Sequence, residues 1–127
     1  MKSWLISTAG KLGGYQAARL LTRNQPKILM YHRFSEQPSS SAVSRAGFER
    51  QLRIIKRWFN PMTLTQLAEA KAQGQTPKHA VVITVDDGYR DFYEIAYPLL
   101  RHYQVPATFF VTTGFINRDI WLWPDQV

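Results

Sequence analysis

Two adjacent carboxylates at the end of an apolar run are the residues of this chain best suited to chemistry. The run, residues 80–85, is rich in β-branched residues, and Asp86, Asp87 and Gly88 follow it directly. It predicts a strand buried on both faces, and ligands of α/β proteins bind at the carboxyl ends of such strands. Adjacent acids repel each other unless a cation lies between them or one takes up a proton. One acid can therefore hold a metal ion while the other acts as a base toward water, although a plain Asp-Gly turn before a helix explains the same residues equally well.

A histidine stands at the end of a second apolar run. Residues 27–34 predict the first core strand, and His32 lies near its polar end. A lone histidine at a strand end is most commonly a hydrogen-bonded structural residue. Parallel barrel strands, however, deliver their carboxyl ends to one rim, so His32 and Asp86 are expected to converge. His79 precedes the strand of residues 80–85 and His102 lies off an apolar helix face, so we expect both to be structural or exposed.

The segments between these two runs predict helices. Apolar residues at helical spacing predict a helix over residues 45–58 that ends before Pro61. A short strand at residues 62–64 follows, and Thr65 is the expected N-cap of a helix that stops at Gly74.

A third helix and another strand follow the two acids. Apolar residues predict a helix along residues 92–103, which Pro98 should kink or shorten. Residues 107–112 predict another buried strand. The alternation of strands and helices along the chain implies an α/β fold with a parallel sheet and right-handed crossovers.

Composition and charge narrow the class of protein. The 127 residues are 45% hydrophobic, as in a globular domain, and the lack of cysteine excludes disulfides and thiolate metal sites. Residues 1–60 carry a net charge of +9 and residues 61–127 a net charge of −2. A basic half is compatible with anionic lipid or an acidic polysaccharide, but a solvated helix face explains it most simply. No recognised motif supports nucleic acid as a partner.

Residues 1–26 form a separate basic amphipathic amino-terminal segment. Its apolar patch at residues 4–6 is too short for a signal-peptide core or a membrane span. We expect its helix to dock on the protein's own core, with a membrane surface as the alternative. The expected location is the cytoplasm or the inner membrane face, and the alternatives are the cell surface and the periplasm.

The segment Thr84 to Tyr89 resembles the Thr-Phe-Asp-Asp-Gly signature of the polysaccharide deacetylases, the NodB-homology or carbohydrate esterase 4 family. Val85 replaces the usual Phe. The similarity continues through residues 97–100 and 105–111. It implies that residues 27–127 are the amino-terminal half of a distorted (β/α) barrel of the NodB type. Because such barrels usually need about 200 residues or more, we expect the chain to be truncated.

The resemblance also implies an activity and roles for three residues. Members of this family hydrolyse the N-acetyl groups of amino sugars in polysaccharides with a divalent metal ion, commonly zinc. Asp87 would be the carboxylate ligand of that ion, and Asp86 the base that acts on the water the ion activates. One branch with a permuted motif order has a segment similar to Met30-Tyr31-His32, which implies that His32 is the general acid.

The family's metal site takes two further histidines from a short His-[Ser/Thr]-x-x-x-His segment, and nothing here matches it. Only His32, His79 and His102 are present, and no two of them are closely spaced. We therefore expect this chain alone to be inactive and to bind metal weakly. The alternative is a non-catalytic glycan- or membrane-binding module derived from a deacetylase domain.

Overall fold

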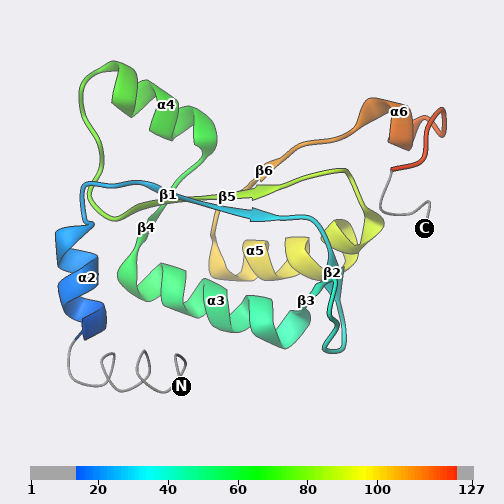
Figure 1. Ribbon diagram of the computed structural model, residues 1–127, viewed down its shortest axis with the longest axis horizontal. Helices are drawn as coiled ribbons and strands as arrows, with labels where there is room; N and C mark the ends of the chain where they lie inside the picture. The colour runs from blue at the N-terminus through cyan, green and yellow to red at the C-terminus, as the bar shows by residue number, and fades with distance from the viewer. Residues whose placement is uncertain (1–13, 123–127) are drawn as a thin grey trace.

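The computed structural model describes residues 14–122 and shows the expected alternation of helices and parallel strands (Figure 1). In chain order the elements are α2 (Tyr15–Leu21), β1 (Lys27–Tyr31), β2 (Phe34–Ser35), β3 (Val43–Ser44), α3 (Arg45–Trp58), β4 (Asn60–Pro61), α4 (Leu64–Ala72), β5 (Ala80–Val85), the π-helix η2 (Phe92–Ala96), α5 (Tyr97–Tyr103), β6 (Thr108–Phe109) and α6 (Thr113–Ile116).

Strand β5 is the centre of a four-stranded parallel sheet, and all six of its residues are buried. Strand β1 pairs with it along one edge, from Lys27 opposite Val81 to Tyr31 opposite Val85. The other edge is shared by β4, which pairs with the beginning of β5, and β6, which pairs with its end. The predicted buried strand before the two acids is therefore confirmed.

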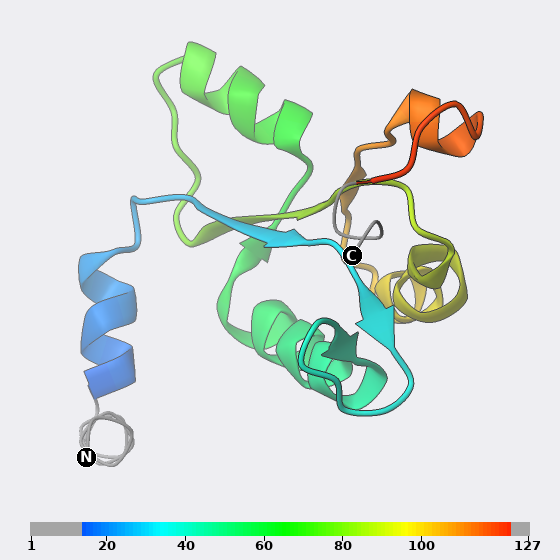
Figure 2. The same cartoon turned by 45° about the vertical axis from the view of Figure 1, so that its right-hand side comes forward.

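The side chains of β5 alternate between two cores. Val81, Ile83 and Val85 belong to the larger core, with α3 and α5, whereas Ala80 and Val82 pack with residues of α4. Figures 1 and 2 show α3 and α5 together on one side of the sheet and α4 on the other. This arrangement holds β5 from both faces, as expected for an α/β fold.

Helix α3 has the bounds that the sequence predicts. The Ser44 side chain accepts a hydrogen bond from the Gly47 amide and caps its first turn. Phe48, Leu52 and Ile55 are buried against the sheet. The spacing of these three residues places them on one face of the helix, which fixes its orientation.

The bounds of the next two elements were predicted incorrectly. The short strand is at Asn60–Pro61 and not at residues 62–64, and the N-cap of α4 is Thr63 and not Thr65. Thr63 accepts a hydrogen bond from the Gln66 amide, and the Gln66 side chain accepts one from the Thr63 amide, which forms a capping box. The amides of residues 60 and 62 donate hydrogen bonds toward β5. Pro61 lies between them and its nitrogen faces away from β5, so its lack of an N–H removes no hydrogen bond between the two strands.

The strand expected over residues 27–34 is divided in two. Strand β1 ends at Tyr31, and β2 pairs with β3 in a separate two-stranded sheet. The prediction that this strand is buried in the core is also wrong, because Ile28, Leu29 and Met30 are exposed. Among the strands of residues 14–122, β1 pairs with β5 alone and lies at an edge of the sheet.

The chain after the two acids also differs in detail from the prediction. Regular α-helix begins at Tyr97, with Pro98 in its first turn and the π-helix η2 before it, so the predicted shortening at Pro98 is confirmed. Strand β6 has two residues in place of the six expected, and Phe110 and Val111 are exposed. The expectation of a buried strand there is therefore wrong.

Helix α2 does not dock on the core as expected. None of its residues is buried, and Leu21 is 82% exposed. Its described contact with α3 is the Arg19 guanidinium, 4.2 Å from the centre of the Trp58 ring. Contact of this helix with an anionic membrane surface stays a prediction. None of the helices within residues 14–122 combines the length and the hydropathy that crossing a bilayer requires, and the apolar patch at residues 4–6 lies outside the described residues.

The capping box gives a direct test of the bounds of α4. Thr63→Ala removes the side chain that caps the helix and should lower the free energy of unfolding by about 1 kcal/mol. Thr65→Ala is the matched control, because it changes an exposed position inside the helix and should change stability by less than about 0.5 kcal/mol. Urea unfolding followed by circular dichroism measures both, and an equal loss in the two variants would contradict this assignment.

Candidate active site

The carboxylate of Asp86 lies where β5 ends, beside the end of β1. The Asp86 amide donates a hydrogen bond of 2.9 Å to the Tyr31 carbonyl, which continues the pairing of the two strands by one residue. The Oδ2 atom of Asp86 is 3.9 Å from Nε2 of His32. The structure therefore brings together the acid and the histidine that the sequence predicts to converge.

The second oxygen of Asp86 is in an unusual environment. Oδ1 is buried and has no hydrogen-bond partner among the described residues, although the side chain as a whole is 26% exposed. A buried polar atom without a partner costs about 1–3 kcal/mol, and such atoms in native structures call for an explanation. An oxygen that binds a proton, a water molecule or a cation during function provides one.

The turn that follows Asp86 has a shape that few residues allow. Asp87 has φ of +77° and Gly88 has φ of +91°, so both are in the left-handed region. Aspartate is one of the residues that enter this region most readily, and glycine enters it freely. A Cβ on Gly88 would also lie 3.1 Å from Cδ1 of Ile116 and 3.3 Å from Cγ1 of Val111. The turn therefore requires glycine for both reasons, and this fixes the course of the chain just after the acids.

A tyrosine anchors the end of β1 next to His32. The Tyr31 hydroxyl donates a hydrogen bond of 2.6 Å to Oε1 of Gln51 on α3, and its ring packs edge-on against Phe48. Burial raises the pKa of Tyr31, which keeps its hydroxyl protonated as a donor. The residue before His32 is thus held by the larger core.

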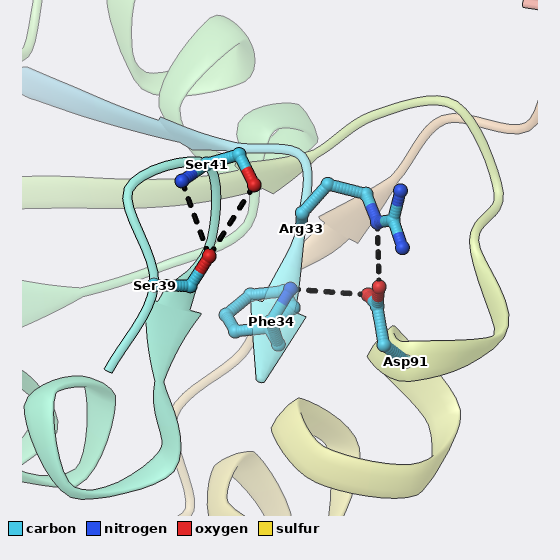
Figure 3. Close-up of polar contacts among 5 residues, drawn as sticks. All are labelled: Arg33, Phe34, Ser39, Ser41 and Asp91. Atoms are coloured by element: carbon cyan, nitrogen blue, oxygen red, sulfur yellow. Dashed lines mark hydrogen bonds and ion pairs between the residues drawn. The ribbon is translucent and has the colours of Figure 1, made fainter. Parts of the chain in front are cut away.

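The residues after His32 are held by an aspartate that the sequence analysis missed. Asp91 accepts a hydrogen bond of 2.7 Å from Nε of Arg33 and another of 3.2 Å from the amide of Phe34 (Figure 3). The Arg33 guanidinium also lies 4.0 Å from the centre of the Tyr89 ring. The segment that carries His32 is therefore tied to the chain just after the two acids. No local pattern signals this, because Arg33 and Asp91 are 58 residues apart in sequence.

The other two histidines are away from the site, as the sequence predicts. His79 precedes the first residue of β5, where its amide donates to the Arg23 carbonyl, and Nδ1 of its ring is buried without a partner among the described residues. His102 is exposed on α5, where its ring contacts Tyr103 edge-on. The length of β5 separates His79 from Asp86.

The described residues do not complete a zinc site. Within residues 14–122, no three histidine, cysteine, aspartate or glutamate side chains are grouped closely enough to hold a metal ion. Zinc sites use three or four protein ligands. Asp87 is the carboxylate that fits part of such a site, and the remaining ligands are missing from this part of the chain.

Comparisons with known proteins agree with the motif at the end of β5. Residues 73–127 match the family model described as polysaccharide deacetylase. A poly-β-1,6-N-acetyl-D-glucosamine N-deacetylase of Staphylococcus aureus (strain MSSA476) is 35% identical over 86 residues, which are 67% of this chain and 30% of that protein. The chain belongs to the polysaccharide deacetylase family.

Two solved structures share the fold of this chain. A Streptococcus pyogenes deacetylase, PplD, determined in complex with acetate, superposes with a TM-score of 0.66 and 30% identity over 76% of this chain and 46% of its own. IcaB from Ammonifex degensii gives a TM-score of 0.60 and 32% identity over 68% of this chain and 37% of its own. The predicted fold class, part of a NodB-type α/β barrel, is confirmed, and the matched segment spans less than half of each of these relatives.

The contacts of Asp91 predict its contribution to stability. Its side chain is 14% exposed, and Asp91→Ala removes the hydrogen bond that each of the Arg33 guanidinium and the Phe34 amide donates to it. The free energy of unfolding should fall by about 1–3 kcal/mol. Glu94→Ala is the matched control on the same helical segment, because it removes only an exposed ion pair with Arg90 and should cost less than about 1 kcal/mol. If both substitutions lower the free energy of unfolding by the same amount, the hydrogen bonds of Asp91 stabilise the protein no more than the exposed ion pair does.

Proposed function

We propose that the intact protein is a metal-dependent hydrolase that removes N-acetyl groups from amino sugars of a polysaccharide. The observation that carries this proposal is the pairing of Asp86 with His32, 3.9 Å apart, at the end of the strand that bears the family's motif. The buried Oδ1 of Asp86, which has no hydrogen-bond partner within residues 14–122, supports a role in binding or moving a proton. Poly-β-1,6-N-acetyl-D-glucosamine, the polymer named for the relative in Staphylococcus aureus, is the substrate that we propose to test first.

In this reaction the oxygen of a water molecule bonds to the acetamide carbonyl carbon, and the carbon–nitrogen bond breaks. Acetate leaves, and a free amine stays on the sugar. Asp86 takes a proton from the attacking water, and His32 gives a proton to the departing nitrogen. The distance of 3.9 Å between Nε2 of His32 and Oδ2 of Asp86 is longer than a direct hydrogen bond and places both groups close enough to act on one substrate.

A divalent ion, for which zinc is our proposal, would polarise the acetamide carbonyl and lower the pKa of water at the site. Asp87 is the carboxylate that would hold it, beside Asp86 at the left-handed turn after β5. The described residues supply too few ligands for tight binding. The proposal therefore requires ligands in addition to those described here.

Separate substitutions of the two acids should have different effects in the intact protein. Asp87→Ala should remove bound metal and activity together. Asp86→Asn should keep the metal and lower kcat by about 10²–10⁴-fold, because only the base is lost. Metal analysis and acetate release measure the two effects, and His102→Gln on exposed α5 is the control that should change neither. An Asp87→Ala protein with unaltered metal content and activity contradicts the assignment.

The 127-residue chain alone should release no acetate from β-1,6-linked N-acetylglucosamine oligomers, and zinc should bind it weakly. Its three histidines are in three separate parts of the fold, so they do not form a ligand set with Asp87. Acetate detection with zinc in excess, compared with a blank and with the intact protein, tests this expectation. Turnover by the 127-residue chain above the blank refutes it.

A further inference from the structure

Helix α2 and the outer side of α3 together form a basic surface. Helix α2 contains no acidic residue. Helix α3 turns its apolar side to the sheet, and Arg50, Arg53 and Arg57 are exposed on its outer side. Its single acid, Glu49, accepts a hydrogen bond from the Tyr103 hydroxyl. Within residues 14–122, none of these three arginines forms an ion pair with a carboxylate, so their charge is not neutralised by the protein itself.

Trp58 connects the two helices of the basic surface. The Arg19 guanidinium of α2 lies 4.2 Å from the centre of its ring, and the Arg57 guanidinium of α3 lies 4.8 Å from it. Two positive charges are therefore close to one indole, and neither is ion-paired with a carboxylate of the described residues. Like charges this close repel each other, and a bound anion removes the repulsion. The cluster thus favours an anionic partner.

Exposed apolar side chains lie among these charges. Leu20 and Leu21 of α2 are 59% and 82% exposed, and Tyr15 and Trp58 are also exposed. A soluble polyanion would leave the two leucines in water. A bilayer, in contrast, takes up apolar side chains between its headgroups while arginines meet its phosphates, and tyrosine and tryptophan are enriched at its interface. The combination of side chains therefore favours an anionic lipid surface.

The basic surface lies toward the end of the sheet opposite the candidate active site. Helix α2 leads into β1 and α3 ends just before β4, so α2 and the end of α3 are at the amino ends of the strands. Asp86 and His32 follow the carboxyl ends of β5 and β1. Figures 1 and 2 show α2 at the end of the sheet away from the tips of these two arrows. The six residues of β5 separate the two ends by about 20 Å.

We propose that the basic surface of α2 and α3 binds an anionic lipid bilayer, with the candidate active site turned away from the membrane. The lipid phosphates meet the arginines, and the exposed leucines of α2 enter the headgroup region. This inference is independent of the proposed reaction, because it uses none of the residues assigned to metal binding or proton transfer.

Binding of the intact protein to vesicles tests the proposal. The protein should sediment with vesicles of mixed phosphatidylcholine and phosphatidylglycerol and stay in solution with phosphatidylcholine alone. Arg50→Gln and Arg57→Gln should each weaken binding about fivefold. Lys71→Gln is the matched control, because it removes one charge at an exposed position of α4, on the other side of the sheet, and should leave the affinity unchanged. Equal binding to both kinds of vesicle, or unchanged affinity in both arginine variants, overturns the proposal.

A soluble polyanion is the competing partner, and Leu21 distinguishes the two. Leu21→Gln should weaken binding to the mixed vesicles about fivefold or more, because it removes an exposed apolar side chain that the bilayer would bury. It should leave any binding of inorganic polyphosphate unchanged. A Leu21→Gln protein that binds the vesicles as tightly as the unsubstituted protein shows that only charge is recognised, and this overturns the bilayer as partner.

Hydrogen exchange tests the orientation without any substitution. The mixed vesicles should slow the exchange of residues 15–21 and leave that of residues 86–92 unchanged, whereas the reverse pattern overturns the proposed orientation. Slow exchange of residues 15–21 before lipid is added places another segment of the intact protein over α2 and also overturns the proposal. Acetate release from soluble oligomers tests the proposed function separately, and its absence leaves the vesicle results to decide the membrane surface.

Discussion

The register between β1 and β5 is the constraint on which the candidate site depends. Tyr31 pairs with Val85, and the hydrogen bond from the Asp86 amide to the Tyr31 carbonyl extends this pairing. His32 and Asp86 are therefore the first residues beyond the paired strands, and this brings them close together. A slip of one residue would reverse the face of every side chain on β1, and the packing of the Tyr31 ring against Phe48 in the larger core opposes it.

Two further contacts turn this proximity into a fixed arrangement. The Tyr31 hydroxyl holds the chain before His32 to α3, and Asp91 holds the chain after it through Arg33 and Phe34. Asp91 follows the left-handed turn at Asp87 and Gly88, so a single turn positions both the acids and the anchor of the histidine segment. Strained or unpartnered groups persist in proteins where the surroundings determine them, and here the two contacts fix the chain before and after His32, the residue that faces Asp86.

The sequence was sufficient for features that depend on local periodicity and insufficient for those that depend on distant partners. Helix α3 and strand β5 were predicted with their observed bounds, because each has a continuous apolar pattern. The N-cap of α4 was placed two residues late, because both Thr63 and Thr65 suit that role and only the reciprocal bonds with Gln66 decide between them. The pair of Arg33 and Asp91 could not be predicted, since their contact arises from the crossover between β1 and β5.

Two exposed residues of β1 lie on the same face of the sheet as Asp86. Paired residues of parallel strands share a face, so Ile28 and Met30 lie on the face of Val82 and Thr84, and Asp86 continues that alternation. Helix α4 covers the first half of this face, where Val82 is buried, whereas Met30 is 63% exposed. Because α3 and α5 occupy the opposite face, a group that completes the proposed metal site from the side of Asp86 would approach across the exposed apolar residues of β1. Under the proposed function, a segment that supplied further ligands would also bury this apolar surface, so that completing the site would stabilise the domain.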